Sequence, residues 1–200
     1  MDDIWFVIFS QSDSVGQRML SSSSRWWLPL RNLNKKVLIT TKMAEYGYLN
    51  LLIWARLNNK YAWDIAVTYR AASNGHLETL KWARTNGVEG SIFTISYAAA
   101  LHGHLKILKW IKLDIRPWDH HICSAAALNG HLEILIWSKK HKLPFNSDVC
   151  INAAKNGHLD ILKWAKEGNC PWNVLLCRDI YVIAKEKGDI KMVQWVEENI

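Results

Sequence analysis

The chain has 200 residues, of which half are apolar and 22% are charged, and this composition excludes an intrinsically disordered protein because it supplies enough apolar surface for a core. Its longest strongly apolar run, residues 4–9, is far shorter than the roughly 18 residues of a membrane-spanning helix, and its acidic start is unlike a secretory signal, so we expect a cytoplasmic protein that is not secreted and has no membrane segment. The 25 basic and 18 acidic residues give a net charge of +7, which favours acidic partners or nucleic acid if the charge is clustered.

Residues 1–40 form a segment of their own before the repeats begin. It contains an Ile-Phe pair at 8–9, an aspartate at 13, a Leu-Ser pair at 20–21 and an Arg-Trp pair at 25–26. This order of residue types resembles the F-box. The resemblance implies that the segment docks a Skp-type adaptor of a cullin ubiquitin ligase through Ile8, Phe9, Leu20 and Trp26. The same four side chains could equally form the apolar inner face of a helical cap, which the end of a repeat array needs in any case.

A repeat of 27 to 28 residues runs through residues 41–200. Gly-His-Leu begins at positions 75, 103, 130 and 157, and degenerate copies begin at Gly47 and Gly188. Each of these six glycines is followed seven residues later by a tryptophan: Trp54, Trp82, Trp110, Trp137, Trp164 and Trp195. Such a fixed period is the signature of a repeat array.

Each repeat is predicted to be a helical hairpin. After the glycine, apolar residues at offsets 2, 4, 5, 7 and 8 form the stripe of an amphipathic second helix. Before it, the alanine pairs at 71–72, 99–100, 126–127 and 153–154 indicate a first helix that its neighbours can approach closely. The Asn-Gly pairs are turn signals between the two helices. Because one hairpin cannot bury its own stripe, we predict an all-α fold of stacked hairpins, an α-solenoid.

The junctions between hairpins share a Pro-aromatic-Asp/Asn pattern. It occurs at residues 117–119, 144–146 and 171–173, and without the proline at 63–64. Proline cannot continue the preceding helix, and Asp or Asn two residues later can cap the next one. We expect the aromatic residue to fill the junction of adjacent hairpins.

The last repeat differs from the others. The interval from Gly168 to Gly188 is a few residues longer than its counterparts, which predicts a local irregularity. Its many charged residues are typical of a solvated terminal cap. These residues are Glu186, Lys187, Asp189, Lys191, Glu197 and Glu198.

The stretch from Ala71 to Ala83, Ala-Ala-x-Asn-Gly-His-Leu-Glu-x-Leu-Lys-Trp-Ala, closely resembles the core of the ankyrin repeat. The short period, the second-helix tryptophan and the Pro-Trp-Asp junction are similar to the ankyrin-type arrays of giant DNA viruses and some protists. The resemblance covers residues 41–200 and implies an ankyrin-like α-solenoid of about six helix-turn-helix repeats. Since the usual ankyrin period is about 33 residues, we expect its projecting β-hairpin to be stunted or absent.

The chemically active side chains indicate no metal site and no enzyme. Equivalent histidines in stacked hairpins should lie about 8–10 Å apart or more, whereas the ligands of one zinc ion lie about 2 Å from it. We therefore predict that His76, His104, His131 and His158 make local hydrogen bonds near the start of their second helices. The cysteines, at 123, 150, 170 and 177, have no zinc-type spacing and are expected to be free structural thiols. We expect no cofactor, because no phosphate-binding loop or catalytic motif occurs.

The positive charge is diluted along the array. Lysines at offset 6 are placed to pair with acids at offset 3, as in Lys81 and Glu78. The repeat tryptophans lie on the apolar stripe, so we predict that they are core aromatics rather than a platform for nucleic-acid bases. A basic scaffold that binds nucleic acid or an acidic assembly remains the alternative to a protein-binding array.

We predict a monomeric, non-catalytic module that holds a protein target on the face of the array. The first helices vary between copies at 5, 2 and 1 residues before the glycine, while the framework is constant. The predicted target-binding residues at these positions are Arg70, Ser73, Leu101, His102, Leu128, Asn152 and Lys155. With a working F-box, the module would tether its target to a ubiquitin ligase without chemistry of its own.

Overall fold

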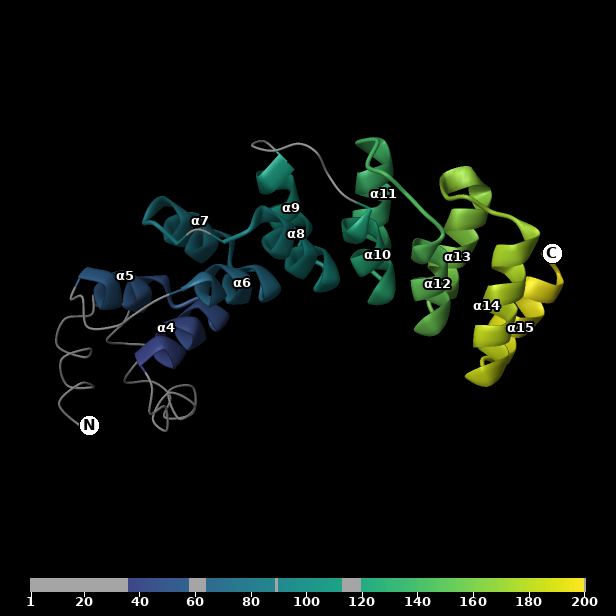
Figure 1. The fold of residues 1–200 in the computed structure, drawn as a ribbon, viewed down its shortest axis with the longest axis horizontal. Helices are drawn as coiled ribbons and strands as arrows, with labels where there is room; N and C mark the ends of the chain where they lie inside the picture. The colour runs from purple at the N-terminus through teal and green to yellow at the C-terminus, as the bar shows by residue number, and fades with distance from the viewer. Residues whose placement is uncertain (1–35, 58–63, 89, 113–119, 200) are drawn as a thin grey trace. The chain divides into compact units, whose positions relative to one another are not determined.

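The computed structural model describes residues 36–57, 64–88, 90–112 and 120–199 (Figure 1). The predicted adaptor contacts Ile8, Phe9, Leu20 and Trp26 lie outside the described residues. Within the described ranges the chain forms twelve α-helices, one π-helical turn and no strand, so the all-α prediction is confirmed. No helix in these ranges is long and apolar enough to cross a membrane.

The helices divide between two compact units, residues 1–91 and 92–200. In the first unit, α4 (Lys36–Glu45) pairs with α5 (Leu49–Leu57), and α6 (Ile65–Ser73) pairs with α7 (Leu77–Thr85). The two hairpins are joined chiefly by packing of α4 against α6. The first helix of the array therefore begins at Lys36 and spans residue 41.

The second unit contains four hairpins. These are α8 (Ile92–Leu101) with α9 (Leu105–Lys112), α10 (His121–Leu128) with α11 (Leu132–Lys140), α12 (Asp148–Lys155) with α13 (Leu159–Trp164), and α14 (Val174–Glu186) with α15 (Ile190–Glu197). The first helices pack in succession, α8 on α10, α10 on α12 and α12 on α14 (Figure 1). The predicted pairing of helices and stacking of hairpins is thus seen inside each unit.

Alanine allows the first helices to approach closely. The predicted pairs are buried in every described copy, and α8 and α10 each bury a third alanine, Ala98 and Ala125. A methyl side chain keeps the helix axes near one another without leaving a void. The first helices are therefore the continuous part of each unit's core.

The second helices bury a narrower stripe than we predicted. In the four Gly-His-Leu copies, offsets 4, 5 and 8 are buried, as in Ile107, Leu108 and Ile111 of α9, whereas offset 2 is mostly half-buried. The prediction of core tryptophans is confirmed only for Trp137 of α11, which is 8% exposed. The other five lie half-buried at the edge of the stripe: Trp54, Trp82, Trp110, Trp164 and Trp195.

The predicted glycine turn is present in every described copy. At Gly103, φ is +80°, the glycine N–H donates to the carbonyl of Ala100, and the next N–H, of His104, donates to the carbonyl of Ala99 at 2.8 Å. This is the Schellman arrangement, in which a left-handed residue ends a helix and satisfies its last carbonyls. The alanine pair thus supplies the carbonyl acceptors as well as the close packing.

Two of the predicted junction caps are confirmed and one is wrong. The Asp64 side chain accepts from the N–H of Ala66 at the start of α6, and that of Asn173 accepts from the N–H of Leu176 at the start of α14. Asn146 does not cap α12, because its side-chain amide donates instead to the carboxylate of Asp148 at 2.7 Å. Asp119 lies outside the described residues.

The junction aromatics pack differently from our prediction. Phe145 lies 5.8 Å from Trp164 between ring centroids, and Trp172 lies 5.8 Å from Trp195. The first pair is tilted and the second meets edge-on, so each junction ring packs against the tryptophan of the hairpin that it begins.

The irregularity predicted between Gly168 and Gly188 is seen in α14, and a π-helical turn that begins before Gly168 leads into it. A π-helical turn, η1 (Ala165–Asn169), ends the second helix of the third hairpin, and α14 has 13 residues where α12 has 8. Pro171 precedes Gly188 by 17 residues, whereas Pro144 precedes Gly157 by 13. The four extra residues are about one helical turn, so they lengthen α14 while keeping the same face toward α12.

The last hairpin is less polar on its surface than we predicted. Its charged residues are solvated, with Asp189 half-buried. However, Val174, Leu175 and Ile190 are each about 70% exposed. Nothing among the described residues covers these apolar side chains.

Candidate functional site

Inside each unit, repeat histidines join one hairpin to the next. Nε2 of His131 lies 3.0 Å from the carbonyl oxygen of Leu101, and Nε2 of His158 lies 3.2 Å from that of Leu128. Because a carbonyl can only accept, the imidazole nitrogen carries the proton and donates. For these two histidines the prediction of local hydrogen bonds is wrong, since donor and acceptor are 30 residues apart and belong to consecutive hairpins.

Each of these imidazoles also lies over the glycine of the preceding hairpin. A Cβ atom built on Gly103 would lie 2.7 Å from Cε1 of His131, and one on Gly130 would lie 2.8 Å from Cε1 of His158. The carbonyls that the histidines reach belong to the last turn of a first helix, where no helical N–H is available. The regular spacing of glycine and histidine within this chain therefore encodes an interlock between hairpins, and it holds the first helices in register.

The seven predicted target-binding residues fall into three groups. Arg70 is exposed on α6 of the first unit, whereas Ser73 is buried there. His102 and Lys155 are exposed near the C-terminal ends of α8 and α12, and Leu101 is half-buried. The structure brings together two of the seven, which line one pocket: Leu128 and Asn152.

His102 lies beside two other imidazoles. Its ring centroid is 6.5 Å from that of His104. Partial burial, together with the nearby His104 and His131, lowers the pKa of His102 below its ordinary value. A histidine whose pKa lies below its ordinary value is mainly neutral at pH 7, so His102 adds little positive charge to this surface.

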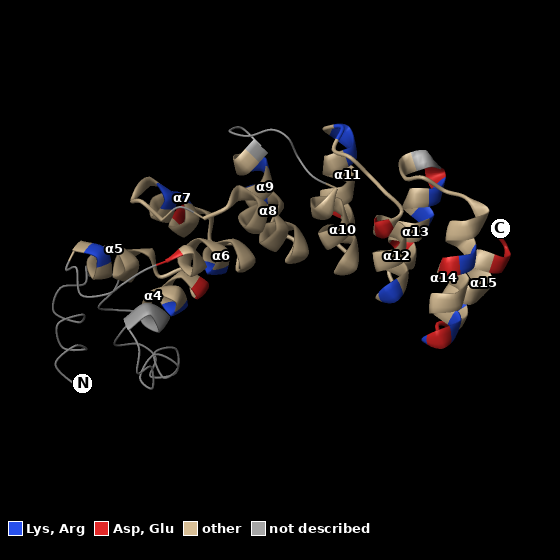
Figure 2. Ribbon diagram, viewed as in Figure 1, with Lys and Arg blue, Asp and Glu red and all other residues tan. Residues whose placement is uncertain are grey.

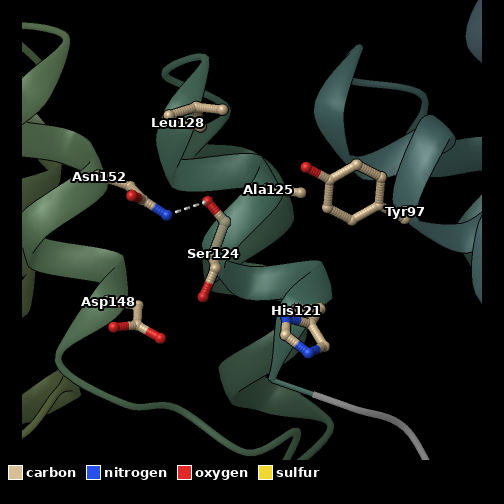
Figure 3. A pocket seen from close by; sticks show the side chains of 7 residues that line it. All are labelled: Tyr97, His121, Ser124, Ala125, Leu128, Asp148 and Asn152. Atoms are coloured by element: carbon tan, nitrogen blue, oxygen red, sulfur yellow. Dashed lines mark hydrogen bonds between the residues drawn. The ribbon is translucent and has the colours of Figure 1, made fainter.

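The pocket lies on the first-helix face of the second unit and has a volume of about 250 Å³. Three helices supply its walls, with α10 in the middle, α8 on one side and α12 on the other (Figure 3). The lining residues are Tyr97 of α8, His121, Ser124, Ala125 and Leu128 of α10, and Asp148 and Asn152 of α12. We name it the α8–α10–α12 pocket.

The polar groups of this pocket are held in place by few bonds. The Asn152 side-chain amide donates to the backbone carbonyl of Ser124 at 3.2 Å, which leaves the Asn152 side-chain oxygen as an acceptor (Figure 3). Ser124 is buried, with 8% of its surface exposed, and its hydroxyl has no hydrogen-bond partner. Asn146 orients the exposed carboxylate of Asp148. A buried hydroxyl without a partner costs about 1–3 kcal/mol, so Ser124 is a group that a ligand would satisfy.

Aromatic rings border the pocket on the α8 side. Phe93, which is half exposed, stacks on Tyr97 with 6.4 Å between centroids and meets His121 edge-on at 5.6 Å. The phenol of Tyr97 points toward Ala125 across the α8–α10 junction (Figure 3). The pocket thus combines acceptor oxygens with aromatic surface.

Sequence reasoning missed five lining residues: Tyr97, His121, Ser124, Ala125 and Asp148. Ala125 lies 5 residues before its glycine, at a position of the predicted set, but was not named. The other four lie 6 or 9 residues before their glycines, whereas the predicted set used only the positions 5, 2 and 1 before it. Positions 9, 6, 5 and 2 before the glycine follow the i, i+3, i+4, i+7 spacing of a single helix face. Extending the predicted face by one and then two turns would have found them.

The charged side chains lie away from the middle of this face. Helices α8 and α10 contain no Lys, Arg, Asp or Glu, and α12 has Asp148 at its start and Lys155 at its end (Figure 2). On the second helices, Lys81 and Glu78 form the predicted pair at 2.8 Å. The described residues therefore present no continuous basic stripe on the first-helix face of the second unit.

The four cysteines are free and buried. Burial raises the pKa of Cys123 to about 12, and a hydrogen bond to Cys170 together with burial raises the pKa of Cys150 well above its ordinary value. Cys123 and Cys150 are therefore protonated at neutral pH and poor nucleophiles, whereas the hydrogen bond with Cys150 lowers the pKa of Cys170. In the described part of the chain, no group of three His, Cys, Asp or Glu side chains is arranged to hold a metal ion.

No family model and no curated protein matches the chain.

Proposed function

We propose that the protein is a non-catalytic protein-interaction module, built as an ankyrin-like solenoid whose first-helix face holds a protein target. The observation that carries this proposal is the α8–α10–α12 pocket. Its lining side chains differ from repeat to repeat, while the glycine, alanine and histidine positions that fix the backbone are repeated. A constant scaffold with variable side chains on one face is how repeat arrays present a binding surface.

The first-helix face can be tested by affinity capture from a eukaryotic lysate with the full-length protein. A variant carrying Leu128→Glu and Lys155→Glu changes this face in the second unit. A matched variant carrying Ile136→Glu and Lys163→Glu makes the same change of charge at exposed positions of the second helices. We expect a protein bound by the wild type to be retained by the second variant and lost by the first.

The matched pair also separates the nucleic-acid alternative. Non-specific binding to a polyanion depends on total charge and falls steeply with salt, so both variants would lose it to the same extent. Equal loss from both variants, or capture of nucleic acid alone, would contradict the proposal.

We further propose that residues 1–40 dock a Skp-type adaptor, so that the array recruits its target to a cullin-type ubiquitin ligase. The support is the F-box-like residue order alone. The test is binding of a purified Skp-type adaptor to the full chain and to a variant with Ile8→Ala, Phe9→Ala, Leu20→Ala and Trp26→Ala. Truncation at Lys42 is a poor test, because it would cut α4 and expose the face that packs on α6. Equal binding by both proteins, or binding by neither, would contradict the adaptor proposal and leave the helical cap as the interpretation of this segment.

A further inference from the structure

We infer that the α8–α10–α12 pocket binds the guanidinium group of an arginine in an exposed segment of a protein partner. The inference rests on the proposed protein-binding function and names the chemistry that the first-helix face selects. The volume of about 250 Å³ is below the roughly 300–1,000 Å³ of sites for whole small molecules. It suits one side chain of a larger partner.

The polar groups of the pocket call for a donor. The Asn152 side chain has its amide nitrogen engaged and offers its oxygen, and the Asp148 carboxylate accepts one bond from Asn146 and retains further capacity. The Ser124 hydroxyl, buried and without a partner, adds a third oxygen on the wall between them (Figure 3). Guanidinium carries five N–H donors and no acceptor, so it can satisfy several of these oxygens at once.

The charges near the pocket favour a cation. Asp148 is the one acid of α8, α10 and α12, and their one Lys or Arg is Lys155, which lies two helical turns further along α12. None of the lining residues is Lys or Arg. A phosphate or carboxylate would therefore meet Asp148 without a compensating cation, which excludes nucleic acid and acidic segments from this pocket in spite of the chain's net positive charge.

The aromatic border distinguishes arginine from lysine. Phe93, Tyr97 and His121 present ring surface on the α8 side. A planar and weakly hydrated guanidinium can stack on such rings while it donates to a carboxylate, whereas an ammonium group is compact and strongly hydrated. We therefore expect arginine to bind more tightly than lysine.

The test uses N-acetyl-arginine amide and the full-length, isotope-labelled protein, followed by NMR. We expect millimolar arginine amide to shift the amide signals of Ser124, Asp148 and Asn152. The citrulline analogue, which has the same shape without the charge, should bind about tenfold more weakly, since charge-assisted hydrogen bonds are roughly twice as strong as neutral ones. Shifts spread over the whole surface, or no shift at these residues, would overturn the inference.

Three variants locate the site. Asp148→Asn should weaken arginine binding about tenfold, while Asp160→Asn, in the corresponding first turn of α13, should leave it unchanged. Ser124→Ala should weaken binding without lowering the midpoint of urea unfolding, because it removes a buried hydroxyl that has no partner in the free protein. Arginine binding unaffected by both Asp148→Asn and Ser124→Ala would contradict the assignment.

The outcome is separable from that of the proposed function. If arginine amide fails to bind but capture of the partner still requires the first-helix face, only the assignment of arginine as the ligand is contradicted. If arginine amide binds and no partner depends on that face, the proposed function falls and the pocket remains a site for free guanidinium compounds.

Discussion

At the scale of single residues, the contact between a glycine and the histidine of the next hairpin explains why both recur. Gly103 has φ of +80° and leaves no room for a Cβ beneath His131. Gly188 has φ of +69°, but a Cβ there would meet nothing within 4 Å. The two glycines therefore separate the cost of backbone strain from the cost of displacing the imidazole.

We predict that Gly188→Ala lowers the free energy of unfolding by about 1–2 kcal/mol, the cost of a left-handed residue with a side chain. Gly103→Ala should lower it by about 2 kcal/mol more, because the new methyl group forces the imidazole off the Leu101 carbonyl. In a His131→Ala background this extra cost should disappear. Urea denaturation of Gly188→Ala, Gly103→Ala, His131→Ala and the Gly103→Ala/His131→Ala double variant measures these free energies. If Gly103→Ala costs as much stability in the His131→Ala background as in the wild type, the contact between glycine and histidine contributes nothing to stability.

At the scale of helices, the side chains that begin them show how local sequence signals succeed and fail. Asn173 and Asn146 occupy the same place in the Pro-aromatic-Asn pattern, but only Asn173 accepts a hydrogen bond from its helix. The side-chain amide of Asn146 donates to the carboxylate of Asp148, two residues later. The residue two positions after Asn173 is Leu175, whose side chain offers no acceptor.

We predict that Asn173→Ala lowers the free energy of unfolding by about 1 kcal/mol, the usual cost of removing an N-cap. Asn146→Ala should change it by about 0.5 kcal/mol or less, since no cap bond is lost. Thermal or urea unfolding of the two variants compares them directly. A loss at Asn146 equal to that at Asn173 would mean that residue 146 caps α12 in solution.

The same scale shows what the sequence could and could not predict. The turn at Gly103, the buried alanine pairs and the caps at Asp64 and Asn173 depend on residues within one turn of each other, so the pattern revealed them. The bond from His131 to the Leu101 carbonyl depends on how one hairpin packs on another. The half-burial of Trp164 depends on how much of the apolar stripe of a second helix the neighbouring hairpins cover. The α8–α10–α12 pocket combines three helices from three hairpins, and only two of its lining residues, Leu128 and Asn152, were predicted.

At the scale of the whole molecule, the second unit is a row of hairpins in which α10 and α12 each have a first helix on both sides, while α14 has one on a single side. The stability of such a row is approximately a sum of hairpin and interface contributions. A defect in the last hairpin can therefore be released by opening that hairpin alone, whereas a defect in an inner one weakens two interfaces at once.

We predict that Ile180→Ala in α14 and Leu135→Ala in α11 differ in the extent of the unfolding that they cause. Both side chains are fully buried, and each truncation removes about 2–5 kcal/mol of packing. Hydrogen exchange followed by mass spectrometry should show faster exchange confined to α14 and α15 for Ile180→Ala, because these helices have one neighbouring hairpin. For Leu135→Ala, the faster exchange should extend to α8 and α12 as well, since α10 supports both. If Ile180→Ala accelerates exchange equally from α8 to α15, the unit unfolds as one block, and the first-helix face would then be a rigid surface rather than one that can open from its end.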